Sequence, residues 1–250
     1  MRLANAFAAA LILLAGFVGT ASAQDEAEEG VYAGHIYIDF GTGLRYEPKG
    51  GGYVTQLAGD VYNNTNPLPG TLAALSSTDL AAQWGDRVTT TGTGILQEND
   101  FTFYNSGSSA GPVLTASWGI ALYNASTNAL LGSYSTNPLN FGAGLLAGQF
   151  TIITVSGLGG LNINLNTTDV LMVQQVLTKT GTANRLGIVS ANPPSIGSSA
   201  NTMYINSAAQ GPAGYYTVTN VPNPGYRINV SAPVSSTPKS WGAIKAIYKN

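Results

Sequence analysis

Residues 114–134 read LTASWGIALYNASTNALLGSY, which is two apolar and aromatic runs on either side of a polar loop. The runs are Leu114–Tyr123 and Ala129–Tyr134, and the residues between them are mostly Asn, Ser, Thr and Ala. Asn and Ser favour turns because their side chains bond to nearby backbone groups. Two short runs of this composition joined by such a loop predict a β-hairpin.

Runs of the same kind recur from Val31 to Val230 and are separated by Gly, Pro and Asn clusters such as 67–70, 157–160, 192–194 and 222–225. Many short strands with frequent turns predict an all-β fold, and we expect an antiparallel β-sandwich of the jelly-roll or immunoglobulin-like kind spanning 31–230. A right-handed β-helix is the alternative, but it requires a regular repeat that the sequence lacks. Leu72, Leu75 and Leu80 fall roughly on one helical face and indicate a turn or two of helix within 71–84.

The first 23 residues have the pattern of a secretory signal peptide. Arg2 precedes an uncharged, mostly apolar run that ends near Gly19, and Ala21-Ser-Ala23 forms a small-residue cleavage site. A membrane-anchoring helix is the alternative, although the run is short for one. We therefore expect an exported chain beginning at Gln24 with an acidic leader over 24–30. No later apolar run is long enough to predict a membrane span, so we expect a secreted or outer cell-surface protein of a bacterium.

The last twenty residues differ in composition from the rest. Residues 231–239 are a Pro/Ser/Thr linker, and the tail 240–250 reads SWGAIKAIYKN. Trp241, Ile244 and Tyr248 have helical spacing, while Lys245 falls on another face. The tail is thus expected to be a short amphipathic helix that docks on a partner surface, for example a sorting machine.

The composition excludes several classes of function. The 250 residues hold 10 basic and 12 acidic side chains, no cysteine and one histidine. Nucleic-acid binding needs clustered Lys and Arg, which are absent. Disulfides, thiolate sites and cysteine nucleophiles are excluded by the lack of cysteine. With a single histidine as well, the chain cannot supply the usual zinc ligand sets.

Two sequence features resemble catalytic motifs but lack the context that catalysis requires. Gly107-Ser-Ser-Ala-Gly111 places Ser109 in a nucleophile position, but a nucleophile elbow needs a following helix and a later histidine. His35 lies upstream, and we interpret it as an exposed or sheet-edge polar residue of its strand. A carboxylate pair for an extracellular glycan hydrolase or lyase is the alternative function, although no spacing among the acids selects a pair.

Calcium binding remains open, because oxygen ligands suffice for it. Gln97-Glu-Asn-Asp100 places two carboxylates together at a strand entry, and Asp169 follows a second polar stretch. The candidate ligands are Glu98, Asp100 and Asp169. The alternative is that these residues only form turns and bind no metal, in which case the protein has no cofactor.

Two stretches, 103–134 and 192–216, give the chain a loose resemblance to known proteins. Their motifs are Phe103-Tyr-Asn-Ser-Gly107, Gly119-Ile-Ala-Leu-Tyr-Asn-Ala-Ser126 and Asn192-Pro-Pro-Ser-Ile-Gly-Ser-Ser199. Their order is similar to exported β proteins of unknown function from planctomycetes and related bacteria, many of which carry a PEP-CTERM sorting tail. This chain lacks the Pro-Glu-Pro motif and the C-terminal membrane helix of that tail. The resemblance implies export and a β-rich fold, and it implies no catalytic residue.

The distribution of charge favours binding over catalysis. From Phe101 to Thr168 no residue is charged, so the surface of this segment must be built from Ser, Thr, Asn and Gln. The chain also has 13 tyrosines, and exposed aromatic rings can stack on sugars. We expect a non-catalytic structural or adhesive protein that binds neutral carbohydrate, other surface or matrix proteins, or another copy of itself. A passenger domain that serves only export is a further alternative.

Overall fold

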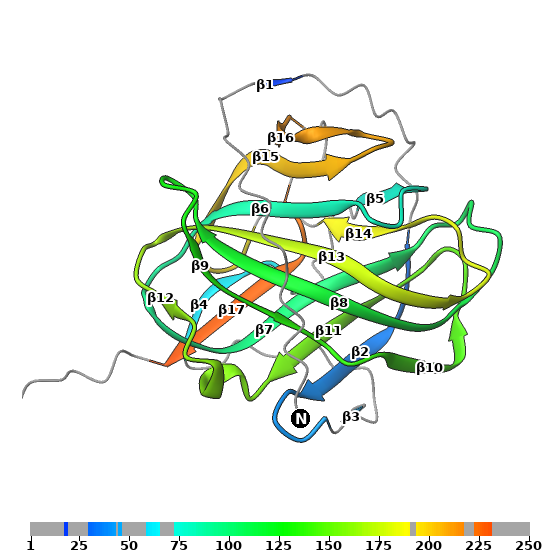
Figure 1. Cartoon of the computed structure of the whole chain (residues 1–250), viewed down its shortest axis with the longest axis horizontal. Helices are drawn as coiled ribbons and strands as arrows, with labels where there is room; N and C mark the ends of the chain where they lie inside the picture. The colour runs from blue at the N-terminus through cyan, green and yellow to red at the C-terminus, as the bar shows by residue number, and fades with distance from the viewer. Residues whose placement is uncertain are drawn as a thin grey trace, which may run out of the picture.

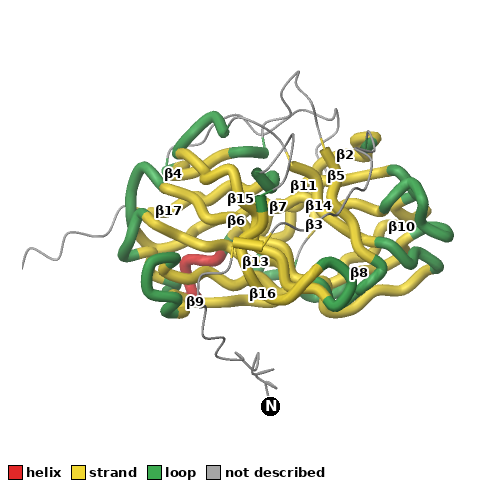
Figure 2. Tube along the Cα trace, turned by 90° about the horizontal axis from the view of Figure 1, so that it is seen from above, coloured by secondary structure: helices red, strands yellow, loops and turns green. Residues whose placement is uncertain are grey.

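The computed structural model describes residues 18–19, 30–43, 45–46, 59–65, 73–190, 194–217 and 223–231. Within these residues the chain is almost entirely β-strand and forms two sheets that pack face to face, which confirms the predicted all-β sandwich (Figures 1 and 2). The expected C-terminal helix, with Trp241, Ile244, Lys245 and Tyr248, lies outside the described residues, as do 24–29 and 232–239. Among the described residues, no helix is long and apolar enough to cross a membrane.

Sheet A has eight strands among the described residues, in the order β1-β16-β15-β6-β13-β8-β10, with β9 also paired to β8. Its strands are β1 (Val18–Gly19), β6 (Gln83–Thr89), β8 (Val113–Asn124), β9 (Leu130–Ser135), β10 (Leu139–Leu145), β13 (Asp169–Gly181), β15 (Ser198–Ser207) and β16 (Gly211–Tyr216). The hairpin predicted from 114–134 is confirmed as β8 and β9, which pair antiparallel. β1 falls inside the predicted signal peptide and pairs parallel with β16 at the sheet edge.

Sheet B has nine strands among the described residues, and its main order is β3-β2-β11-β7-β14-β5. β12 and β17 also pair with β7, and β4 pairs with β17. Its strands are β2 (Val31–Asp39), β3 (Arg45–Tyr46), β4 (Asp60–Asn63), β5 (Ala73–Ser77), β7 (Gly94–Asn105), β11 (Gln149–Ser156), β12 (Asn164–Leu165), β14 (Leu186–Ser190) and β17 (Tyr226–Ser231). β2 and β11 pair parallel, unlike their antiparallel neighbours. A short 3₁₀ helix, η1 (Leu158–Leu161), follows β11.

The helix expected within 71–84 does not form. Leu75 lies in β5, which pairs antiparallel with β14, and the end of the stretch enters β6. Leu75 is buried in a small cluster with Trp84 and Ile188. Pairing with β14 and burial in this cluster therefore prevail over the weak helical spacing of the leucines.

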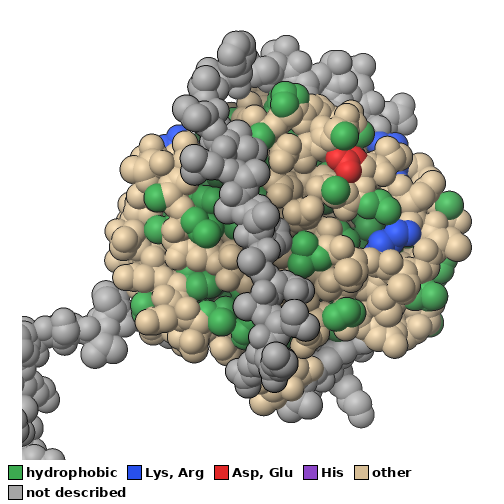
Figure 3. Space-filling model, in the orientation of Figure 1, with side chains coloured by type: hydrophobic (Ala, Val, Ile, Leu, Met, Phe, Trp, Pro, Cys, Tyr) green, Lys and Arg blue, Asp and Glu red, His purple; other side chains and the backbone are tan. Residues whose placement is uncertain are grey.

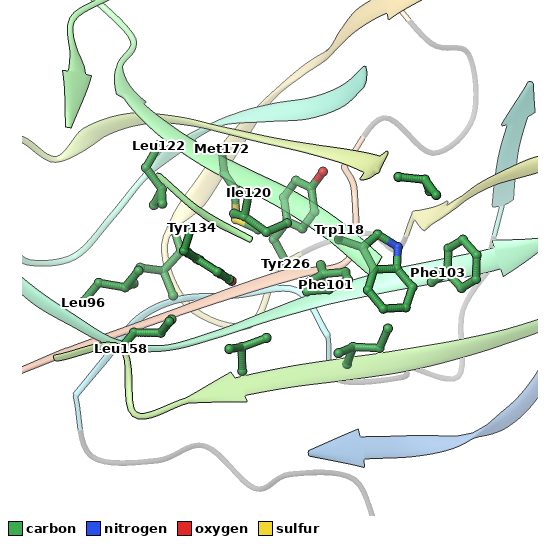
Figure 4. Packing of buried hydrophobic residues seen from close by; sticks show 14 of the residues in the cluster. Leu96, Phe101, Phe103, Trp118, Ile120, Leu122, Tyr134, Leu158, Met172 and Tyr226 are labelled. Carbon is green, nitrogen blue, oxygen red and sulfur yellow. The ribbon is translucent and has the colours of Figure 1, made fainter. Parts of the chain in front are cut away.

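The core follows from period-two alternation along the central strands. In β8 the inward residues include Trp118, Ile120 and Leu122, each no more than 1% exposed. Trp118 meets Phe101 and Phe103 of β7 with ring centroids 5.5 and 5.0 Å apart. These side chains point toward one another between the two layers (Figure 4). From Ala116 to Leu122 every second residue of β8 thus joins the core, and the residues between them face outward from sheet A.

Candidate functional site

The outer face of sheet A carries a polar and aromatic surface, to which strands inside and outside the uncharged stretch Phe101–Thr168 contribute. The strand registers place Tyr215, Tyr204, Gly85, Val173, Ala121 and Ser133 in one row across six strands. At about 4.8 Å per strand, the distance from Tyr215 to Ala121 is roughly 19 Å. In the space-filling view of this side, charged side chains are few and apolar ones are scattered among polar groups (Figure 3).

Three tyrosines from distant parts of the sequence lie on this face. Tyr204 and Tyr215 are cross-strand neighbours whose rings meet edge to face with centroids 5.9 Å apart. Tyr123 packs against the same apolar cluster, which also holds Leu171 and Val173. Tyr204 is buried, whereas Tyr123 and Tyr215 are half-buried. The two outer rings thus remain partly accessible above a buried apolar floor.

These tyrosines are neutral phenols over the physiological pH range. Burial, with smaller contributions from Tyr123 and Tyr215, raises the pKa of Tyr204 to about 12. Burial also raises the pKa of Tyr123 and of Tyr215 above the usual value. The partly exposed rings of Tyr123 and Tyr215 therefore offer uncharged apolar surface, while the Tyr215 hydroxyl itself is buried.

A ladder of amide side chains crosses the next row of the face. Asn206 Nδ2 donates to Gln83 Oε1 at 3.0 Å, and Gln83 Nε2 donates to Gln175 Oε1 at 3.1 Å. The three side chains come from β15, β6 and β13 and are each half-buried. Within the described residues, Gln175 Nε2 at one end and Asn206 Oδ1 at the other have no protein partner. The ladder therefore offers the two N–H donors of an amide nitrogen at one end and an amide oxygen acceptor at the other.

Hydroxyl pairs continue the polar surface toward one end of sheet A. Ser117 Oγ lies 2.7 Å from Thr178 Oγ1, and Thr115 Oγ1 lies 2.8 Å from Thr180 Oγ1. Each pair joins β8 to β13 at directly opposed positions. Together with the amides, they make this part of the face polar but uncharged.

Asp169, one of the three candidate calcium ligands, lies at the other end of the face and is bound to an arginine. Arg87 donates to both carboxylate oxygens of Asp169, at 2.8 and 2.6 Å, and Ser126 Oγ donates to Oδ2 at 2.5 Å. The bond from Arg87 is the main reason that the pKa of Asp169 is lowered. The pair cancels its own charge, so it leaves the face neutral.

The other two candidate calcium ligands, Glu98 and Asp100, lie on sheet B and bind Arg227. The Arg227 guanidinium donates to Asp60 at 2.9 Å, to Asp100 at 2.9 and 3.0 Å, and to Glu98 at 2.5 Å. The side chains of Arg227, Asp60 and Asp100 are 0% exposed, and that of Glu98 is 28% exposed. Three strands, β4, β7 and β17, therefore meet at one buried cation.

The structure does not bring the three candidate ligands together around one ion. Asp169 is bound to Arg87 on sheet A, whereas Glu98 and Asp100 share Arg227 on sheet B. Among the described residues, no three His, Cys, Asp or Glu side chains form a group that could hold a metal ion. Arginine thus occupies the positions at which we expected calcium.

His35, which we expected to be exposed or at a sheet edge, is instead 5% exposed and belongs to the same buried network as Arg227. Its Nε2 lies 2.7 Å from Thr154 Oγ1, which donates to Asp100 Oδ1 at 2.7 Å. Its ring stacks on Tyr37 with centroids 4.4 Å apart. Burial, helped by the charge of Arg227, lowers the pKa of His35 to about 4, so the imidazole is neutral near pH 7.

Ser109 lies in a turn, and its hydroxyl bonds only to Asn184 among the contacts described for it. Its Oγ lies 3.4 Å from Asn184 Oδ1 and accepts from the Asn184 backbone N–H at 3.0 Å. β8 follows the turn where a nucleophile elbow would need a helix. His35 is bound to Thr154 on sheet B, so the expected interpretation of 107–111 as a loop agrees with this geometry.

Asp86, a buried acid on the inward face of β6, was not among the predicted site residues. Asp86 is 0% exposed and accepts hydrogen bonds from Ser199 at 2.7 Å and from Tyr62 at 3.2 Å. Burial raises its pKa well above the usual value despite these donors. The one signal in the sequence is spacing: Asp86 lies two residues from Trp84 and two from Val88, so in a strand all three side chains point to the same, inward face.

No family model matches the chain, and no curated protein or solved structure is significantly similar to it.

Proposed function

We propose that this chain is a secreted or cell-surface, non-catalytic β-sandwich protein with a structural or adhesive role, which binds neutral carbohydrate on the outer face of sheet A. The observation that carries the proposal is the juxtaposition on that face of half-buried tyrosine rings and an uncharged amide ladder. A neutral glycan presents apolar ring faces and many hydroxyl groups. The tyrosines suit the ring faces, and the amides suit the hydroxyl groups.

The placement of the acids supports a binding role over the alternative of a glycan hydrolase or lyase. Such an enzyme needs two carboxylates that both reach the glycosidic bond. Asp60 and Asp100 are buried and bound to Arg227, and Asp86 is buried in the core. Asp169 is held by Arg87. Each of these four acids is bonded to side chains of the fold where it lies.

The proposal is tested with the chain expressed with its signal peptide and purified after export. We expect at least one neutral polysaccharide on a glycan array to bind, with affinity unchanged by calcium chelation. Isothermal titration with that polysaccharide should show about tenfold weaker binding for Tyr215→Ala, equivalent to about 1.4 kcal/mol. Tyr37→Ala, which removes a half-buried ring from sheet B, is the matched control.

Three outcomes would contradict the proposal. One is the absence of binding to any neutral glycan. A second is release of reducing ends from a glycan by the purified protein, which would support the hydrolase instead. Equal loss of affinity in Tyr215→Ala and Tyr37→Ala would place the binding site elsewhere than on sheet A.

A further inference from the structure

A small pocket lies at the end of the sandwich where the turn after β2 faces the connection between β9 and β10. It has a volume of about 140 Å³. It is lined by Ile38, Asp39, Phe40 and Gly43 from the sheet B side and by 135–139 from the sheet A side. It is therefore separate from the tyrosine and amide rows on the outer face of sheet A.

The sheet B wall of the pocket is held by a closed turn. Asp39 Oδ1 accepts from the backbone N–H of Thr42 at 2.7 Å and from its hydroxyl at 2.8 Å. Gly43 N–H donates to the Asp39 carbonyl at 2.7 Å, which Gly43 reaches with a positive φ of 71°. These bonds, first of all that from the Thr42 backbone, lower the pKa of Asp39, so its carboxylate is charged near pH 7.

The sheet A wall is fixed to the core strand β8. Thr136 N–H donates to the Trp118 carbonyl at 2.9 Å, and Thr136 Oγ1 accepts from the Trp118 N–H at 3.0 Å. On the facing side, Phe40 packs edge to face on buried Tyr134 with centroids 5.9 Å apart. Both walls are thus positioned before any ligand arrives, which lowers the entropic cost of binding.

The chemistry of the lining suits a ring that bears hydroxyl groups. A carboxylate has about four acceptor positions, and Thr42 fills two of them at Oδ1 of Asp39, so capacity remains for hydroxyl donors. Ser135 and Asn137 are exposed and can each donate and accept. Phe40 and Leu139 supply apolar surface. A cavity of about 150 Å³ accepts a benzene molecule, so this pocket has room for one six-membered ring.

We propose that this pocket binds a single neutral hexose unit, such as the terminal residue of a glycan chain. The inference rests on the proposed function for its ligand class, but it concerns a second site with different residues. Hydroxyl groups of the sugar would donate to Asp39 and bond to Asn137, and one face of the ring would contact Phe40. The outer face of sheet A would bind the length of a chain, and the pocket would bind its end.

The test is saturation-transfer NMR and titration of the exported protein with methyl glucoside, methyl galactoside and methyl mannoside, each in both anomeric forms. We expect at least one to bind, with at least tenfold weaker binding in Asp39→Asn and in Asn137→Ala. Asp79→Asn is the matched control, because Asp79 also accepts backbone and hydroxyl donors in an exposed turn but lies outside the pocket.

The outcomes separate this inference from the proposed function. If no glycoside binds while a polysaccharide still binds sheet A, the pocket inference is overturned and the proposed function stands. If a glycoside binds with equal affinity to the wild type, Asp39→Asn and Asn137→Ala, the pocket is not its site. Binding of methylammonium in place of the glycosides would identify a cation site and overturn the inference. An equal loss of glycoside affinity in Asp79→Asn would overturn the pocket inference as well.

Discussion

Replacing Arg227 tests whether the acids on sheet B are structural. In Arg227→Gln, Asp60 and Asp100 would remain buried without their cation, because both have 0% exposed side chains and bind the guanidinium at 2.9 Å. Removing one partner of a buried ion pair costs about 3–5 kcal/mol. We therefore expect the free energy of unfolding at pH 7.5 to fall by about that amount.

Arg87→Gln is the matched control, because it removes an arginine that also donates two bonds to an aspartate but whose side chain is 42% exposed. Solvent-exposed ion pairs contribute about 0–1 kcal/mol, so we expect a loss within that range. Urea unfolding monitored by the fluorescence of the buried Trp84 and Trp118 gives both values.

The pH dependence provides a second check on Arg227→Gln. Burial already raises the pKa of Asp100 with Arg227 present, and without that cation the pKa should rise further. A carboxyl group whose pKa is raised by folding makes the folded protein less stable as pH rises from the pKa of the unfolded state toward that of the folded state. The deficit of Arg227→Gln should therefore be larger at pH 8 than at pH 5. The double variant Arg227→Gln/Asp100→Asn should recover part of the stability that Arg227→Gln loses, because the amide that replaces Asp100 cannot be charged. A deficit no larger than that of Arg87→Gln, or one independent of pH, would refute the reasoning.

Three further predictions concern stability. Folding lowers the pKa of His35 from 6.5 to about 4, so as pH falls the unfolded chain binds a proton before the folded chain does, and the folded state loses stability between these two pH values. At about 1.36 kcal/mol per pKa unit, the free energy of unfolding of the wild type should fall by up to ~3 kcal/mol relative to that of His35→Gln between pH 7 and pH 4. A difference between the two proteins that does not change with pH would argue against a buried neutral imidazole. In Gly85→Ala a Cβ would lie 2.5 Å from the Met172 carbonyl oxygen, so we expect the free energy of unfolding to fall by about 1–3 kcal/mol in thermal or urea unfolding. Gly160→Ala is the control and should change little, because a Cβ at Gly160 has nothing within 4 Å. Equal losses of stability in the two variants would contradict the close approach at Gly85. Phe103→Ala removes a ring that is 0% exposed and contacts Trp118, and it should cost about 3–5 kcal/mol in the same assay, a loss that would be absent if the two rings did not share a core.

The fold class could be predicted because alternation is a local property of the sequence. The run Leu114–Tyr123 already contains the pattern that buries Trp118 and Ile120 and turns Ser117 and Tyr123 outward. The helix expected near Leu75 was wrong because its spacing was weak and the partner strand β14 lies more than a hundred residues away. Local spacing carries no information about such a pairing.

The candidate site could be predicted only in its general character. The uncharged stretch from Phe101 to Thr168 indicated a polar, neutral surface, and the abundance of tyrosine indicated aromatic contacts. The site itself depends on strand order, since Tyr123, Tyr204 and Tyr215 come from three strands of sheet A. Strand order is set by pairings between residues far apart in the chain.

The calcium hypothesis illustrates the same limit. The sequence shows Glu98 beside Asp100, but it does not show that Arg227, more than a hundred residues later, lies opposite Asp100 in register. Once that guanidinium is in place, both carboxylates accept hydrogen bonds from a cation that the chain itself supplies.

The most direct test of the proposed carbohydrate site is NMR mapping of a neutral oligosaccharide on the exported, isotope-labelled protein. The oligosaccharide should come from whichever polysaccharide binds on the array. We expect the largest changes in amide chemical shift on β6, β13, β15 and β16 around Tyr204, Tyr215, Gln83 and Gln175. Shift changes confined to sheet B around Arg227, or no shift changes at saturating ligand, would contradict a carbohydrate site on the outer face of sheet A.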